Sequence, residues 1–320
     1  MTRDLPGACR ELLAHQQGVV SRGQALDAGM SSQIVRSMLR SGRWQRLHYG
    51  VYAAFTGEPG RAAVLWAALL RAGPDAVLSH FTAAELDQLG PVCSPIHISV
   101  SANRRVEPIS GVVLHRRSDI RLVRHPTRLP PRTRIEETAI DLTLCAATLD
   151  DALGWLARAC GSRLTTPALL GAALAARRRV RWRRELASAL GDIGSGAHSL
   201  LELRYLRDVE RPHGLPIARR QSRTRQGQHA RYRDVLYEQF GVGVETDGAV
   251  AHPAHERWRD RQRDNAGAVG GVITLRYGWG DVTQRPCQVA AQVASVLQRR
   301  GWTGTPRPCA PACPITLNRR

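Results

Sequence analysis

Residues 31–52 read SSQIVRSMLRSGRWQRLHYGVY, a short amphipathic segment that passes directly into a predicted β-hairpin. Ser31 or Ser32 can cap a helix that Gly42 ends, because serine oxygens accept the first free amides and glycine tolerates a left-handed turn. The stretch WQRLHYGVY then predicts two short strands that meet at Gly50. A capped helix followed at once by a hairpin is typical of the second half of a winged helix-turn-helix module.

The predicted helix in this stretch has one apolar and one polar face. Four apolar side chains share the first face: Ile34, Val35, Met38 and Leu39. Four polar side chains share the opposite face at i, i+3, i+4 and i+7: Gln33, Arg36, Ser37 and Arg40. Arginine and glutamine are the residue types that hydrogen-bond guanine and adenine edges in a major groove. The alternative is a small helical bundle whose polar stripe is merely solvated. The hairpin favours DNA binding, with Arg46 and His48 placed to contact phosphates.

The residues before this helix also carry helix signals. Ser21 and Gln24 form a capping box, and Gly29 supplies a left-handed stop before the next helix. The stretches GVVSRGQALDAGMSSQIV and RLHYGVYA resemble the N-terminal winged helix of the abortive-infection (AbiEi) antitoxin family. That resemblance implies DNA binding, repression of the chain's own operon and a toxin partner.

The charge of the chain favours a polyanionic partner. The chain has 320 residues and a formal net charge of +19, and all 46 basic residues are arginine. The absence of lysine excludes a Walker A phosphate loop and Schiff-base chemistry. An excess of arginine suits phosphate groups, although codon bias produces the same substitution of arginine for lysine. A membrane surface is the weaker interpretation, because no predicted helix pairs a basic face with a Trp/Phe/Leu face.

Cysteine usage and hydropathy predict a cytoplasmic protein. Five of the seven cysteines are scattered singly, which suits reduced thiols. Cys309 and Cys313 form a C-x3-C pair, but zinc needs about four ligands and no partner pair is near in sequence. The longest apolar run, residues 62–70, is far shorter than the ~20 residues of a membrane helix. The start of the chain has no apolar core of signal-peptide length.

The middle of the chain predicts helices with little chemistry. Ala- and Leu-rich stretches near 60–72, 137–147, 150–160 and 166–176 indicate helices, and 96–100 and 111–115 indicate short strands. His80 is isolated in the sequence and receives no role. Residues 177–184 read RRRVRWRR, which suits a solvated helix face or linker as well as a phosphate-binding segment. The glycine-rich residues 191–198 predict a domain boundary.

A second candidate site lies near the C-terminus. Residues 232–248 read YRDVLYEQFGVGVETDG, in which two apolar runs flank a turn and predict a β-hairpin. Asp234 and Glu245 can come close on its adjacent strands, while Glu245 and Asp247 share a face because side chains two apart point the same way. Converging carboxylates repel each other unless a cation lies between them. A few hard oxygen ligands suit Mg2+, which keeps several waters.

This region resembles the PD-(D/E)xK nuclease superfamily, and most closely the domains related to very-short-patch-repair endonucleases. The resemblance covers 199–302 through SLLELRYL, YRDVLYEQFGVGVETDGAVAH, RWRDRQRDN and ITLRYGWGDV. It implies five catalytic side chains: Asp234, Glu245, Asp247, His252 and Glu202. Asp234 and Glu245 would hold Mg2+ or Mn2+, and Asp247 stands where the superfamily has its lysine.

The same resemblance implies how the remaining residues act. His252 would transfer the proton, because the superfamily lysine is absent from this chain and arginine does not titrate near neutrality. Arg261 and Arg263 would contact DNA beside the site. Glu202 would be the acid on the leading helix, although a capping box with Ser199 explains it equally well. Surface or structural acids in an inactive fold remain the alternative for the whole cluster.

The sequence therefore predicts a mixed α/β protein in four parts. These are a winged-helix domain at 1–57, a mainly helical middle domain at 58–192, a restriction-endonuclease-like α/β domain at 193–302 and a disordered basic tail at 303–320. The expected function is metal-dependent DNA cleavage in toxin–antitoxin systems or phage defence. The alternative is an antitoxin-like transcriptional regulator with an inactive nuclease fold. RNA stays open as a target, since metal-assisted hydrolysis does not itself choose the sugar.

Overall fold

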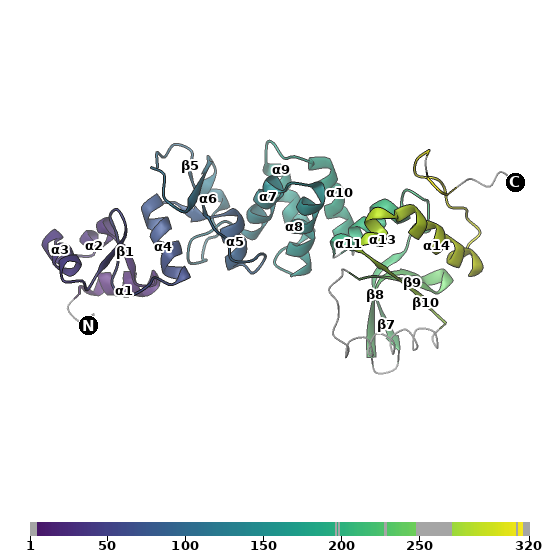
Figure 1. Cartoon of the computed structure of the whole chain (residues 1–320), viewed down its shortest axis with the longest axis horizontal. Coiled ribbons are helices and arrows are strands. Elements are labelled where there is room, and N and C mark those ends of the chain that lie inside the picture. The colour runs from purple at the N-terminus through teal and green to yellow at the C-terminus, as the bar shows by residue number, and fades with distance from the viewer. Residues whose placement is uncertain are drawn as a thin grey trace. The chain divides into compact units, whose positions relative to one another are not determined.

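The computed structural model of the chain describes residues 5–195, 197, 199–226, 229–247, 271–311 and 313–315, with the backbone alone for 221–226, 229–233 and 247. The chain divides into two compact units, Met1–Cys145 and Ala146–Arg320 (Figure 1). This division falls within 58–192, for which the sequence predicts a single domain. Both units combine helices with small sheets, in agreement with the predicted mixed α/β class.

The first part of unit 1 follows the order helix, strand, helix, helix and hairpin. Its elements are α1 (Gly7–His15), β1 (Val19–Ser21), α2 (Arg22–Asp27), α3 (Ser32–Arg40), β2 (Gln45–His48) and β3 (Val51–Ala53). The central strand of the sheet is β3, which is antiparallel to both β1 and β2. The predicted helix at 32–40 and the hairpin that follows it are thus present as α3, β2 and β3.

Local hydrogen bonds fix where α2 and α3 begin. Ser21 Oγ accepts the amide of Gln24 at 3.1 Å, and the Gln24 side chain accepts the amide of Ser21 at 3.1 Å. This is the predicted capping box. Ser31 Oγ caps α3 by accepting the amide of Ile34 at 3.2 Å. Gly29, at φ +90°, turns the chain between the two helices.

The core beneath α3 corrects one prediction from the sequence. Val35 is buried, and Met38 and Leu39 pack partly against the same core. Ile34, predicted to face inward with them, is 44% exposed. Adjacent helical residues differ by about 100° around the axis. The small sheet and its neighbouring helices therefore cover Val35 and leave Ile34 at the surface.

The rest of unit 1 places helices around a second three-stranded sheet. Its elements are α4 (Arg61–Ala72), β4 (Val77–Leu78), α5 (His80–Leu86), β5 (Ile96–Ser101), β6 (Val112–Arg117), α6 (Ile120–Val123) and α7 (Ile135–Cys145). Strand β5 is parallel to β6 and antiparallel to β4. The strands predicted at 96–100 and 111–115 are thus confirmed within one or two residues. Apolar side chains of α4 pack on this sheet, Leu65 and Leu69 among them.

Three histidines stack where α5 meets β5 and β6. The rings of His80 and His115 lie 3.6 Å apart between centroids, and His97 Nδ1 lies 3.0 Å from His115 Nε2. Isolated in the sequence, His80 is therefore not isolated in the fold. Burial lowers the pKa of His115 to about 4, with a further contribution from the charge of His97. Burial also lowers the pKa of His97, so both rings are neutral at pH 7.

Unit 2 begins with four helices and a π-helical turn. They are α8 (Leu149–Gly161), α9 (Pro167–Ala176), α10 (Arg183–Gly194), α11 (Leu200–Arg204) and η1 (Tyr205–Glu210). The predicted boundary at 191–198 lies inside this unit, because α10 extends into it and Asp192 is buried and paired with Arg211 at 2.5 Å. In either unit, no helix of the described residues has the length and apolarity that a membrane span requires.

A four-stranded sheet with the order β10-β9-β8-β7 follows these helices. Its strands and later helices are β7 (Arg219–Gln226), β8 (His229–Tyr237), η2 (Glu238–Phe240), β9 (Val242–Asp247), β10 (Ile273–Gly278), α13 (Trp279–Gln284) and α14 (Pro286–Arg299). The predicted hairpin is confirmed as β8 and β9, with Gly241 at φ +59° in its turn. Strand β10 is parallel to β9. Figure 1 shows α13 and α14 beside the sheet, and α13 contacts β10.

The core of unit 2 lies between this sheet and α14. Val235, Val242 and Val244 of the sheet belong to one buried cluster with Val293 and Leu297 of α14. Nonpolar burial of this kind contributes roughly 1.5–3 kcal/mol for each large side chain. The sheet and the last helix therefore stabilise each other.

A buried polar network ties η1 to the sheet. Tyr205 Oη lies 3.0 Å from Tyr237 Oη, and Tyr237 donates to Glu210 Oε2 at 3.2 Å. Glu210 also pairs with Arg220 at 2.7 Å, and both side chains are 5% exposed. Burial raises the pKa of Glu210, although the Arg220 charge opposes the shift. The pairing satisfies a carboxylate that would otherwise be costly to bury.

The segment after α14 has a described path along unit 2. The sequence predicts a disordered tail from residue 303. In the structure, the amide of Arg307 donates to the carbonyl of His213 at 3.0 Å. Ile315 is 6% exposed and belongs to the core cluster of this unit. Residues 303–311 and 313–315 therefore contribute contacts to the fold.

The histidine stack predicts a pH-dependent stability for unit 1. Because the folded-state pKa of His115 is about 4, the unfolded chain binds more protons between about pH 6.5 and pH 4. The contribution of the neutral His115 ring to the stability of unit 1 is therefore fully present above about pH 6.5 and is lost as the pH falls. We expect the urea midpoint of the wild type to be lower at about pH 5 than at neutral pH. The midpoint of His115→Gln should decrease less over the same pH range. His15→Gln, at an exposed histidine of α1, should behave as the wild type. An unchanged pH dependence in His115→Gln would contradict the assignment.

Candidate nucleic-acid interface

The polar face of α3 is open to solvent. The four side chains predicted to contact DNA from this helix are exposed: Gln33, Arg36, Ser37 and Arg40. They recur at a spacing that keeps them on one stripe of the helix. Each arginine presents a planar fork of donors, and glutamine presents a donor and an acceptor side by side. The stripe can therefore make paired hydrogen bonds to flat acceptor groups.

Two further features of α3 were missed from the sequence. The side chain of Ile34, 44% exposed, adds an apolar surface next to Gln33. Apolar groups of this size can contact the methyl group of thymine. Arg22 Nη2 donates to Ser32 Oγ at 2.9 Å and links the start of α2 to the start of α3. The stripe is thus anchored at its N-terminal end.

The hairpin of β2 and β3 presents a second exposed surface. Arg46 is exposed on β2, and Tyr49 is 82% exposed at the tip, where Gly50 has φ +70°. Tyr49 was missed from the sequence, although an aromatic residue directly before a turn glycine was a usable signal. His48 is half-buried, and burial and then the charge of Arg71 lower its pKa. His48 can therefore donate a hydrogen bond but carries little charge at pH 7.

The charge around these surfaces has a single sign. Residues 28–57 contain four arginines, at 36, 40, 43 and 46, and no aspartate or glutamate. Arg43 is exposed between α3 and β2. Because opposite charges are absent from this segment, its field attracts anions. The geometry and the charge both suit a phosphate-bearing polymer.

The two acids of the predicted metal site lie on neighbouring strands of unit 2. Strands β8 and β9 pair Val235 with Val244. The paired residues run from Val235–Val244 to Tyr237–Val242, and Asp234 and Glu245 lie one residue beyond the last pair on their strands. The prediction of a metal site requires their side chains to lie on the same face.

Both carboxylates have protein partners. Asp234 Oδ2 accepts hydrogen bonds from the amide of Thr246 at 2.9 Å and from its hydroxyl at 3.2 Å. Arg276 Nη2 lies 2.7 Å from Glu245 Oε2, because the parallel register of β9 and β10 sets these residues side by side. Arg276 therefore supplies a cation next to Glu245, and it competes with a metal ion for that carboxylate.

The remaining predicted site residues differ in what the structure describes. Glu202 is 4% exposed on α11, which contacts β9. Its amide donates to Ser199 Oγ at 3.0 Å, which confirms the half of the predicted capping box that does not involve the Glu202 side chain. The backbone of Asp247 pairs with Gly278, and its side chain lies outside the described part of the chain. Three further residues also lie outside the described residues: His252, Arg261 and Arg263.

Part of the arginine run at 177–184 has local partners. Arg183 donates to the backbone carbonyls of Leu174, at 2.6 Å, and of Arg177. Arg181 stacks over the ring of Trp182, with 3.8 Å between its guanidinium carbon and the ring centroid. These contacts join α9 to α10. Arg183 therefore has a structural role, whereas Arg181 remains exposed to solvent.

The first module is similar to one known protein family. Residues 10–54 match a family model described as "Transcriptional regulator, AbiEi antitoxin". No curated protein matches the chain. The chain is similar to the crystal structure of the RV2827C protein from Mycobacterium tuberculosis, at 18% identity and a TM-score of 0.37, over 57% of this chain and 76% of that chain. The family model thus supports the resemblance of the N-terminal module, and it does not extend to 199–302, where the nuclease resemblance stays a prediction.

Proposed function

We propose that this chain is a DNA-binding transcriptional regulator of the AbiEi antitoxin type, whose N-terminal module recognises the DNA. One observation carries the proposal. The exposed stripe of α3 lies in a segment rich in arginine and free of acids, inside the residues 10–54 that match the family. The hairpin with Arg46 and Tyr49 belongs to the same segment.

Recognition would follow the helix-turn-helix mode. The second helix of such a module enters the major groove, and its N-terminal residues contact base edges. Gln33 and Arg36 are then the base-reading side chains, since glutamine pairs with adenine and arginine with guanine. Arg40, one turn further on, would contact a base or a phosphate. Arg46 and Tyr49 on the hairpin would hold the sugar–phosphate backbone and fix the orientation of the module.

The partners follow from the family and from the charge. The family description names an antitoxin, and on that basis we infer a cognate toxin partner. We also infer repression of the promoter that precedes the chain's own gene. A regulator of this kind works in the cytoplasm. The net charge of +19 predicts binding that weakens steeply with salt, because each neutralised phosphate releases counterions.

Substitutions in α3 and in the hairpin should have different effects. Arg36→Ala removes a base contact, so we expect affinity for the promoter site to fall at least about fivefold, with weaker discrimination against unrelated DNA. Arg46→Ala removes a phosphate contact, so binding should weaken equally on all sequences and the salt slope should fall by about one. Fluorescence anisotropy with promoter and scrambled duplexes at several salt concentrations measures both effects.

Arg105→Ala is the matched control, because Arg105 is an exposed arginine of unit 1 outside the proposed interface. It should bind both duplexes like the wild type. If Arg36→Ala and Arg46→Ala bind like Arg105→Ala, α3 and the hairpin do not form the interface. A wild-type protein that does not prefer its own promoter region would contradict the proposed self-repression.

The acids of β8 and β9 favour a second candidate, metal-dependent phosphodiester hydrolysis. Asp234 and Glu245 each lie one residue beyond the paired stretch of these strands, so we expect their side chains to lie close together. Two carboxylates are a sufficient protein donor set for Mg2+ or Mn2+, since such ions keep several waters. A bound ion would supply an activated water at neutral pH. Asp247, His252 and Glu202 would support the site as the nuclease resemblance implies, while Arg261 and Arg263 would contact the nucleic acid.

A plasmid-nicking assay tests this second candidate. We expect nicking by the wild type in Mg2+ or Mn2+, none in chelator, and a loss of at least about 100-fold in Asp234→Ala and in Glu245→Ala. Glu238→Ala changes an exposed acid in the same hairpin and should nick like the wild type. Nicking that survives both substitutions would exclude this site. An absence of cleavage of both DNA and RNA in any metal would leave the regulator as the function.

A further inference from the structure

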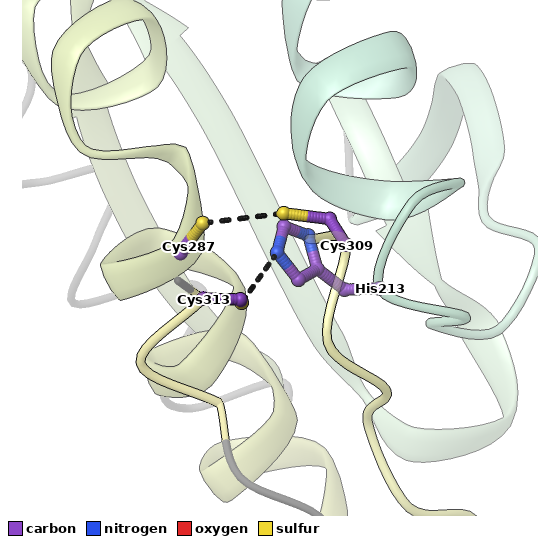
Figure 2. A group of neighbouring side chains, drawn as sticks. All are labelled: His213, Cys287, Cys309 and Cys313. Atoms are coloured by element: carbon purple, nitrogen blue, oxygen red, sulfur yellow. Dashed lines mark hydrogen bonds between the residues drawn. The ribbon is translucent and has the colours of Figure 1, made fainter. Parts of the chain in front are cut away.

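Four side chains with metal-ligating atoms converge in unit 2, away from the residues assigned above. His213 follows η1, Cys287 lies in the first turn of α14, and Cys309 and Cys313 lie in the segment after α14. Figure 2 shows the four side chains pointing towards one another from these separate segments. Their ligand atoms all lie within 4.8 Å of one another.

The distances within the cluster are those of ligands around one ion. Cys287 Sγ lies 3.5 Å from Cys309 Sγ, and Cys313 Sγ lies 3.7 Å from His213 Nε2. Tetrahedral zinc, with Zn–S bonds of ~2.3 Å and Zn–N bonds of ~2.0 Å, separates two sulfurs by ~3.8 Å and a sulfur from a nitrogen by ~3.5 Å. The sulfur separation in the cluster is much longer than a disulfide bond of ~2.0 Å.

The imidazole of His213 is held in the orientation that a metal ligand needs. Its Nδ1 lies 2.8 Å from the backbone carbonyl of Val209, and the ring is buried. A carbonyl oxygen only accepts, so the ring proton is on Nδ1 and the lone pair of Nε2 faces Cys313. Metal-bound histidines almost always donate their other ring N–H in this way.

We propose that His213, Cys287, Cys309 and Cys313 bind one structural zinc ion. Three thiolates and an imidazole fill all four tetrahedral positions and leave none for water or substrate, which is typical of a structural site. Thiolate ligands select zinc over magnesium or calcium. The close spacing of all four ligand atoms suits one ion, because the ligands of an iron–sulfur cluster are divided among two or more irons and some of them lie further apart.

The site would join three segments that are distant in the sequence. Cys313 and His213 are 100 residues apart, and Cys287 and Cys309 are 22 apart. Backbone contacts already support the arrangement, since the amide of Arg307 donates to His213 O at 3.0 Å and the amide of Cys313 donates to Ala310 O at 3.0 Å. A zinc ion would link the segment that contains Cys309 and Cys313 to α14 and to the turn after η1.

Metal analysis of the full chain, purified with a reductant, tests the proposal. We expect about one zinc ion per chain in the wild type. After dialysis against a chelator, Cys313→Ser and His213→Ala should each retain at least about tenfold less zinc than the wild type. Cys145→Ser, at an exposed cysteine of unit 1, is the matched control and should retain it all.

Cobalt substitution of the wild type keeps the test independent of how the variants fold. Thiolate-to-cobalt charge-transfer absorption that zinc abolishes would support the site. A wild type that contains less than about a tenth of a zinc ion per chain and gives no such absorption would overturn it. So would a disulfide between Cys287 and Cys309, identified as a cross-linked peptide pair in a digest of unreduced protein, because it would consume two of the proposed ligands.

Discussion

The exposed surface of α3 and the hairpin depends on the antiparallel pairing of β3 with both β1 and β2. The three residues of β3 are buried, so this strand is held between its neighbours and against the core. The amide of Arg22, at the start of α2, donates to Gly50 O in the hairpin turn at 2.8 Å. The helices and the hairpin are therefore fixed relative to each other. Without this pairing, the arginines of α3 and the hairpin would not present one continuous surface.

Features that depend on neighbours in sequence were predictable. The caps at Ser21 and Ser31 and the turn at Gly241 depend on residues at most four positions away, so short motifs are enough to find them. The polar stripe of α3 follows from helical periodicity in the same way. Helical periodicity wrongly predicted that Ile34 is buried. The width of the helix face that is covered depends on the size of the elements that pack against it, and the sequence of the helix alone does not give that size.

Features that depend on distant segments were not predictable. Asp234 and Glu245 follow the paired stretch of a hairpin whose strands are consecutive, whereas Arg276 reaches Glu245 through a strand much later in the chain. His80 acquires its ring partners through β5 and β6, and Cys309 acquires a neighbouring thiol through α14. No residue spacing encodes these contacts. The lack of a second ligand pair near a C-x3-C motif in the sequence is therefore only weak evidence against a metal site, because the other ligands can come from distant segments.

The parallel pairing of β9 with β10 sets the order in which unit 2 can assemble. Strands β7, β8 and β9 are consecutive hairpin partners. They can therefore pair one after another, and each pairing closes only a short loop. Strand β10 begins only at Ile273 and runs in the same direction as β9, so its pairing joins residues 31 positions apart in the sequence, such as Val242 and Ile273. Contacts of such high contact order form slowly. The last strand and α14 should therefore dock late, onto a meander that has already formed.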